Sequence, residues 1–245
     1  MRVSIAMTTY NGERFLKSQL ESIADQSLEP YELVICDDNS KDKTIEILRK
    51  FEKKANFIVK IHQNTKNLGV DKNFEQAISL CEGDLIFISD QDDYWFPDKL
   101  EIMKKFIISD DKCLLAINNT QLTNEKLESV KTFKLDQAKN FVGSDEGFIS
   151  GCCTVFKKQL LQLILPFSED LAYDSWIHFV GINTNSRKVY EKPLQFYRRH
   201  DKNSSNHLIS ELNNINFLKR YMKIFKRFFT KGYSEERHKY NKLNL

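Results

Sequence analysis

The stretch that decides the fold is residues 85–93, which read LIFISDQDD. Its first four residues form a continuous apolar run, and three acids follow almost at once. Such a run is typical of a strand that is covered on both faces of a sheet. We therefore expect a buried strand that delivers a cluster of carboxylates to its carboxyl end.

Similar strand-like runs occur earlier in the chain, and helical patterns separate them. The runs are Val3–Met7, Leu33–Cys36 and Phe57–Ile61, and Pro97 opens a further helical pattern. Strands that alternate with helices predict an α/β fold with a mixed, mainly parallel, Rossmann-like sheet flanked by helices. In such sheets, ligands bind beyond the carboxyl ends of the strands.

Polar clusters stand at three of these strand ends, namely Thr8–Asn11, Asp37–Ser40 and Asp90–Asp93. Because the carboxyl ends of parallel strands share one edge of a sheet, we expect the three clusters to meet there. Three acids so close together need something to offset their repulsion. Mg²⁺ or Mn²⁺ bound together with phosphate oxygens would do so. The alternative is a solvated acidic turn that caps the helix after Pro97.

The second half of the chain gives a weaker pattern. We expect a strand at Cys113–Ile117, an irregular loop region at 120–147, and a strand and turn within Phe148–Phe156. A short helix is predicted at Trp176–Ile182, and extended chain at Lys188–Arg199.

Composition narrows the class of protein. The chain has 245 residues, of which 41% are hydrophobic and 29% charged, so it is long and apolar enough to bury a core. Its five cysteines include no Cys-x-x-Cys pair, so we expect buried, reduced thiols rather than disulfides or a zinc site. The start of the chain does not resemble a signal peptide, and the expected location is the cytoplasm.

The last 35 residues differ in charge from the rest of the chain. Between Glu211 and Leu245 there are nine Lys or Arg residues and three Asp or Glu residues. Apolar residues recur at helical spacing, so 209–245 is predicted to be a basic amphipathic helical tail on an anionic membrane surface. The alternative is packing on its own domain or on a second subunit, which leaves a homodimer open. Nucleic acid is not an expected partner.

Four motifs stand in order with consistent spacing along the first hundred residues: Val3–Asn11, Val34–Ser40, Asn67–Gly69 and Asp90–Asp93. This set resembles the family 2 glycosyltransferases, which have the GT-A fold and invert the anomeric centre of the sugar. The resemblance is most specific over residues 1–100 and extends to about residue 206. The chain is also similar to the bacterial subgroup of this family that builds O-antigen, capsule or rhamnan chains.

The resemblance implies a site for a nucleotide-sugar donor. Tyr10 would stack on a pyrimidine base, and Asp38 would accept a hydrogen bond from its N3–H, which favours uracil or thymine. Asp90 would contact the ribose or a metal-bound water, and Asp92 would bind Mn²⁺ or Mg²⁺ directly. The donor-binding set is completed by Thr8, Asn67, Gln91 and Arg198. The alternatives are a core aromatic for Tyr10 and a helix-capping turn for Asp38.

The resemblance also implies a catalytic base in the second half. Asp174 matches the Asp that deprotonates the acceptor hydroxyl, and Tyr173 stands where the family usually has Glu. Asp174 could also cap the helix that follows. Arg198 or Arg199 would bind the diphosphate, and His200 would be a third metal ligand beside Asp92 and Asp90, or a phosphate donor. Gly151 is interpreted as allowing close approach of the acceptor or of backbone.

These implications give the expected function. Residues 1–208 would form the GT-A domain, with nucleotide bound by 1–100 and acceptor by 101–208. The enzyme would move one sugar from a UDP- or dTDP-sugar, with dTDP-rhamnose as the leading candidate. The acceptor would be a saccharide, lipid-linked at the cytoplasmic face of the inner membrane. The alternatives are a non-catalytic nucleotide-sugar or carbohydrate-binding protein and a sugar nucleotidyltransferase.

Overall fold

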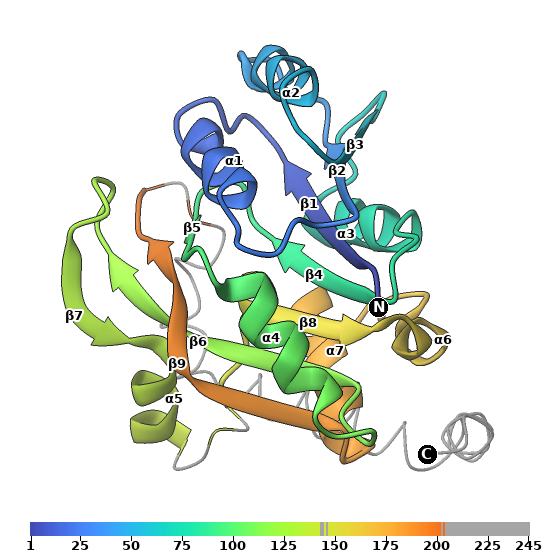
Figure 1. The fold of residues 1–245 in the computed structure, drawn as a ribbon, viewed down its shortest axis with the longest axis vertical. Coiled ribbons are helices and arrows are strands. Elements are labelled where there is room, and N and C mark those ends of the chain that lie inside the picture. Colours follow the sequence, from blue (N-terminus) through green and yellow to red (C-terminus); the bar gives the residue numbers. More distant parts are fainter. Residues whose placement is uncertain (143–144, 146, 202, 204–245) are drawn as a thin grey trace.

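The computed structural model describes residues 1–142, 145, 147–201 and 203. Nine strands form one sheet in the order β3-β2-β1-β4-β8-β6-β9-β5, with β7 paired to β6. Helices flank the sheet on both sides (Figure 1). The α/β class and the mixed sheet are therefore confirmed. The predicted tail at 209–245 lies outside the described residues.

The first half of the sheet consists of parallel strands linked by helices. The elements in chain order are β1 (Val3–Thr9), α1 (Leu16–Ala24), β2 (Glu32–Asp37), α2 (Thr44–Glu52), β3 (Ile58–Gln63), α3 (Val70–Ser79) and β4 (Leu85–Ser89). β1 lies between β2 and β4, and β2 pairs with β3, all in parallel. All four predicted strands are present, and the residues that follow β1, β2 and β4 emerge at one edge.

The second half mixes parallel and antiparallel pairs. Its elements are β5 (Tyr94–Trp95), α4 (Lys99–Ile108), β6 (Leu115–Thr123), β7 (Ser129–Phe133), α5 (Lys134–Val142), η1 (Gly151–Cys153), β8 (Thr154–Lys157), η2 (Lys158–Leu160), α6 (Leu161–Ile164), α7 (Tyr173–Asn183) and β9 (Arg187–Arg198). β8 runs antiparallel to both β4 and β6 and so joins the two halves into one sheet. The expected strand near Phe156, the helix near Trp176 and the extended chain of β9 are confirmed.

Strand residues alternate between two cores. Ile5 and Met7 of β1 pack in the cluster that contains α1 and α4, whereas Ala6 packs in the cluster that contains α3 and α7. This alternation follows from the two-residue period of a strand. It explains why β1, β2 and β4 read as continuous apolar runs, because helices cover both faces.

The prediction of an irregular loop over 120–147 was wrong. β6 extends to Thr123, and β7 and α5 occupy most of the remainder. The polar residues of this segment indicated a loop. In the fold, however, their side chains form hydrogen bonds with other parts of the protein. The Oδ1 atom of Asn119 accepts from the N–H groups of Thr120 and Leu135, and the Thr120 hydroxyl donates to the carbonyl of Gln195. Buried polar groups with such partners are tolerated in a strand interior.

All five cysteines are free and buried, as expected. Among the described residues, no helix combines the length and the apolar character needed to cross a bilayer.

Candidate active site

The ends of β1 and β4 are joined by a pair of hydrogen bonds. The Gln91 side chain accepts from the Tyr10 N–H at 2.9 Å and donates to the Tyr10 carbonyl at 3.1 Å. Tyr10 is 49% exposed, so it is not a core aromatic. Thr8, two residues before it, is partly buried. Gln91 belongs to the acidic loop Asp90–Asp93, which follows β4. Its two hydrogen bonds therefore hold the backbone of the exposed Tyr10 beside this loop.

Asp37 stabilises the loop after β2. Its carboxylate accepts from the Thr9 hydroxyl at 2.9 Å and from the Ser40 N–H at 2.9 Å. Ser40 in turn accepts from the Asn11 N–H at 2.9 Å. These contacts link the ends of β1 and β2, which is the meeting of strand ends that the sequence predicts.

Asp38 organises the turn before α3. Its Oδ1 accepts from the Leu68 N–H at 2.7 Å and from the Asn64 side chain at 3.0 Å, and its Oδ2 accepts from the Gly69 N–H at 2.9 Å. Gly69 has φ 84°, a conformation that glycine adopts most readily. A carboxylate offers about four acceptor positions, so one remains for a further donor. Asn67 is exposed beside this turn, and its role and the role of Asp38 in base recognition stay predictions.

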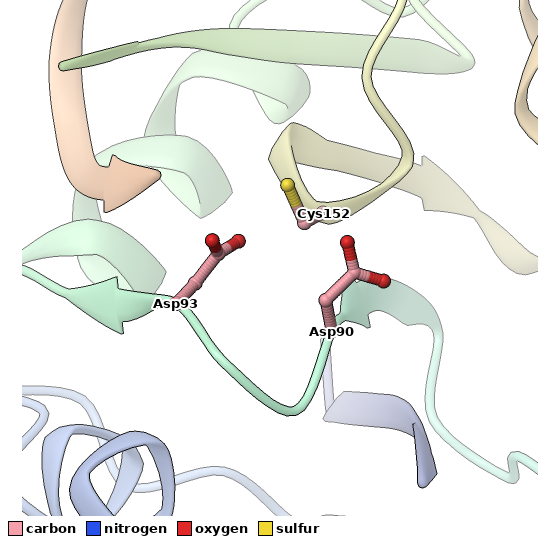
Figure 2. A group of neighbouring side chains, drawn as sticks. All are labelled: Asp90, Asp93 and Cys152. Carbon is pink, nitrogen blue, oxygen red and sulfur yellow. The ribbon is translucent and has the colours of Figure 1, made fainter. Parts of the chain in front are cut away.

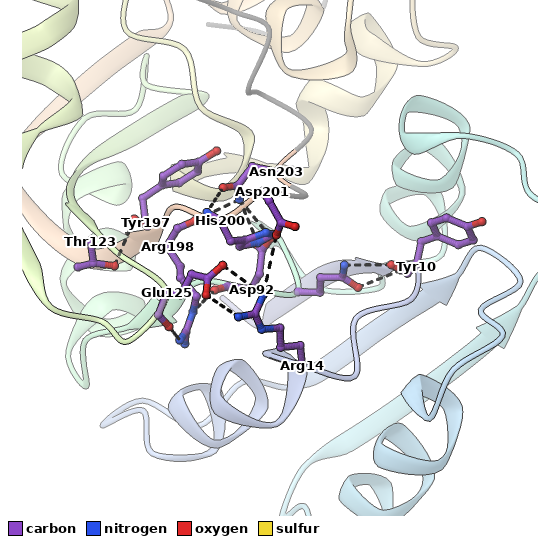
Figure 3. A network of polar contacts seen from close by, with 11 residues as sticks. Tyr10, Arg14, Asp92, Thr123, Glu125, Tyr197, Arg198, His200, Asp201 and Asn203 are labelled. Atoms are coloured by element: carbon purple, nitrogen blue, oxygen red, sulfur yellow. Dashed lines mark hydrogen bonds and ion pairs between the residues drawn. The ribbon is translucent and has the colours of Figure 1, made fainter.

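The acidic loop sends its three carboxylates in two directions. Asp90 and Asp93 face the thiol of Cys152 (Figure 2). Asp92 instead contacts His200, whose Nε2 lies 2.8 Å from the Asp92 Oδ2 (Figure 3). The three residues that were predicted to bind one metal therefore lie in two places in this structure. Asp92 and His200 contact each other, whereas Asp90 faces Cys152. The division is expected physically, because it separates like charges on adjacent residues.

The Asp92 carboxylate is held by contacts with residues that follow β9. Asn203 donates to the carbonyl of Arg198 at 3.1 Å and lies 3.5 Å from the Asp92 Oδ2. The His200 ring packs against Phe15, with ring centroids 4.7 Å apart. His200 and Asp92 are thus placed so that both could contribute to one cation, as a nitrogen and an oxygen ligand.

Burial makes the acids costly to ionise. Burial, with the charge of Asp92 adding to it, raises the pKa of Asp90 to about 7. Burial also raises the pKa of Asp93 well above its usual range. A divalent cation would offset this concentration of negative charge, so the residues present fit one.

Arg198 is buried and donates hydrogen bonds to three neighbouring protein groups. Its Nε donates to the Asp92 carbonyl at 2.8 Å, and its two other nitrogens donate to the Glu125 carbonyl at 2.6 Å and the Ser18 hydroxyl at 3.1 Å. The guanidinium carbon also lies 4.7 Å from the Phe15 ring centre. These contacts indicate a structural support for the Asp92 loop, and diphosphate binding by Arg198 stays a prediction.

Asp174 lies in the first turn of α7, where its Oδ1 accepts from the Ser175 N–H at 2.6 Å. It is half-buried, and burial raises its pKa despite that hydrogen bond and the nearby charge of Lys134. Asp174 is therefore not the N-cap of α7, which is Ala172, but it satisfies one N–H group of the first turn, and its remaining acceptor positions leave it able to take a proton. A carboxylate with a raised pKa is a better base near neutral pH than an ordinary Asp.

The residue that approaches Gly151 is Tyr173. A Cβ atom on Gly151 would lie 1.9 Å from the Tyr173 hydroxyl oxygen. Tyr173 is buried and stacks on Phe74, with ring centroids 4.2 Å apart. The expectation that Gly151 makes room for the acceptor or for backbone is thus corrected, since an aromatic side chain fills that space.

Several residues of the site were missed by sequence reasoning. Lys99 and Gln195 are fully buried beneath the acidic loop, and the Lys134 ammonium donates to the Ser150 hydroxyl at 3.1 Å. Lys134 fell in the segment interpreted as a loop, and Gln195 carries no motif. The one available signal was Lys99, a lysine on the apolar face of its predicted helix.

A family model for glycosyl transferase family 2 matches residues 4–165 of this chain. The dTDP-rhamnosyl transferase RfbG of Shigella flexneri is 30% identical over 216 residues, which is 80% of this chain and 72% of that protein.

Two solved structures share the GT-A fold. TarS of S. aureus, in complex with UDP-GlcNAc, gives a TM-score of 0.67 at 22% identity over 83% of this chain and 60% of the other. The mannosyltransferase PcManGT of Pyrobaculum calidifontis, in complex with GDP-Man and Mn²⁺, gives 0.68 at 18% identity over 92% and 64%. The chain thus spans less than two thirds of either solved structure.

We predict that Gly151→Ala destabilises the protein by about 1–3 kcal/mol, because its new methyl group meets the Tyr173 side chain. Urea unfolding of the single variants, of Tyr173→Phe and of the double variant measures the coupling. Removing the hydroxyl should recover part of the loss. Additive effects of the two substitutions would show that Tyr173 is not the obstacle.

Proposed function

The chain belongs to glycosyltransferase family 2, and from this premise we propose that it transfers one sugar from a UDP- or dTDP-sugar to a saccharide hydroxyl, with inversion. The observation that carries the proposal is the pair of hydrogen bonds between Gln91 and the Tyr10 backbone. It joins the exposed Tyr10 ring, a platform for the base, to the acidic loop, which would face the diphosphate. Residues 1–100 would bind the donor, and residues 101–208 the acceptor.

In this proposal Asp174 is the general base. It takes the proton of the acceptor hydroxyl as that oxygen bonds to the anomeric carbon. The bond from the anomeric carbon to the diphosphate breaks on the opposite face, and the nucleoside diphosphate leaves with the electron pair. The raised pKa of Asp174 supports its role as proton acceptor.

A divalent cation, Mn²⁺ or Mg²⁺, would supply positive charge to the leaving diphosphate. Asp92 is its first ligand in this proposal, with His200 beside it, and Asp90 lies in the same loop with its carboxyl group toward Cys152. Arg199, which is half-buried next to Arg198, remains a candidate to contact the phosphates.

The sugar donor is proposed to be dTDP-rhamnose. The support is the similarity to a relative described as a dTDP-rhamnosyl transferase. A carboxylate at Asp38 is compatible with either uracil or thymine, because both carry the N3–H that it would accept. The product would belong to a bacterial surface polysaccharide.

A screen of UDP, dTDP, GDP and CDP, each with and without Mn²⁺, tests the donor site. Ligands that bind the folded state raise the unfolding temperature. We expect UDP or dTDP to raise it only with Mn²⁺, and Asp92→Asn to remove the Mn²⁺ dependence. Stronger binding of GDP or CDP would contradict base recognition by Asp38. If none of the four binds, a non-catalytic role replaces the proposal.

Asp174→Asn should reduce transfer by roughly 10²–10⁴-fold, the usual contribution of a positioned base, while nucleotide binding is unchanged. The matched control is Asp170→Asn, an exposed acid in the loop before α7, which should keep wild-type transfer. In the wild type, kcat/KM should rise with pH through the raised pKa of Asp174, because only the ionised base accepts the proton. Near wild-type turnover by Asp174→Asn would remove this residue from the mechanism.

We further propose that residues 209–245 bring the enzyme to a lipid-linked acceptor at the cytoplasmic face of the membrane. The support is the basic, aromatic-rich composition of this segment. The full chain should sediment with vesicles that contain anionic lipid and stay in solution with zwitterionic ones. Equal recovery from both would contradict the proposal.

A further inference from the structure

Asp90, Asp93 and Cys152 form a compact group on the inner side of the acidic loop. Asp90 follows β4, Asp93 precedes β5, and Cys152 lies in η1, yet one ligand atom from each lies within 4.8 Å of the others. Their side chains face one another (Figure 2). We propose that these three residues bind a divalent cation of borderline-soft character, such as Zn²⁺ or Co²⁺, at a site separate from the one that contains Asp92.

The first support is an unsatisfied oxygen. Asp93 is fully buried, and its Oδ2 accepts from the Gln195 side chain at 2.9 Å. Its Oδ1 is also buried and has no hydrogen-bond partner. A buried carboxyl oxygen without a partner is costly, and a metal bond would satisfy it.

The second support is the way neighbouring groups hold the ligands. Gln195 donates to Asp93 and also lies 3.3 Å from the Cys152 sulfur, so one amide orients both. Hydrogen-bonded partners of this kind orient the ligands of metal sites.

The buried ammonium of Lys99 lies close to this group, but among the described residues it makes no hydrogen bond to either carboxyl group. It donates to the Cys152 carbonyl at 2.9 Å and to the Gln195 side-chain oxygen, and it lies 3.8 Å from the centre of the Trp95 ring. Its hydrogen bonds therefore go to neutral groups, it acts on Asp90 and Asp93 only through its charge, and the Asp93 Oδ1 stays without a hydrogen-bond donor in the described part of the chain.

The third support is the separation from Asp92. The Asp92 carboxylate contacts His200 and Asn203 (Figure 3). Asp90 and Asp93 face Cys152 (Figure 2). One loop thus carries two ligand groups, and Asp90 and Asp93 belong to the inner one.

The sulfur decides which metals suit the inner group. Magnesium prefers oxygen ligands, whereas a thiolate with two carboxylates favours Zn²⁺ or Co²⁺. Binding removes the proton of the Cys152 thiol, which passes to the buffer as the S–metal bond forms. Asp90 is only partly buried, so the group is reached from its side.

Titration of the full chain with Co²⁺, followed by absorption spectroscopy, tests the proposal. A sulfur-to-cobalt charge-transfer band should appear in the wild type, and Cys152→Ser should abolish it. Cys153→Ser is the matched control and should keep the band, because this adjacent thiol is outside the group. Asp93→Asn should keep the band at saturation but weaken Co²⁺ binding at least about tenfold.

Asp92→Asn separates the two groups. The charge-transfer band should persist in this variant, because Asp92 belongs to the His200 network. Absence of the band in the wild type, its persistence in Cys152→Ser, or its loss in Asp92→Asn would each overturn the inner site. Circular dichroism of every variant confirms that a lost band does not reflect unfolding.

Discussion

Repulsion among three carboxylates within four residues is the constraint around which this end of the molecule is arranged. Burial and the charge of Asp92 already raise the pKa of Asp90 to about 7, so the loop cannot hold all three charges on one side without cost. The chain turns Asp92 toward His200 and the other two acids toward Cys152. Buried cationic side chains and amide groups around the loop then hold each direction in place.

The same loop is connected to the rest of the strand ends through one side chain. Gln91 lies between two acids and bonds both backbone polar groups of Tyr10, so the position of the exposed ring depends on the position of the acids. At the end of β2, Asp37 accepts a hydrogen bond from the loop that follows, and Asp38 accepts one from the turn at Gly69. The edge of the sheet therefore behaves as one connected surface and not as separate loops.

The parts of the fold that followed from the sequence are those in which local pattern and tertiary environment agree. β1, β2 and β4 are buried on both faces, so they read as apolar runs, and their polar ends meet where the α/β rule places them. The prediction of a loop over 120–147 was wrong because polar residues in and beside this segment form hydrogen bonds within the fold. Those of Asn119 are an example. No spacing rule could reveal that Cys152 and Gln195 come to lie against the acidic loop, since only the folded sheet brings β8 beside β4 and β9 beside β5.

The most direct measurement is a crystal structure of the full chain with dTDP and Mn²⁺, in which anomalous scattering locates the metal. The account predicts a peak beside Asp92 and the diphosphate, with the pyrimidine ring stacked on Tyr10 and the base N3–H directed at Asp38. A nucleotide bound away from the ends of β1 and β2, or a metal peak with no contact to the acidic loop, would contradict it.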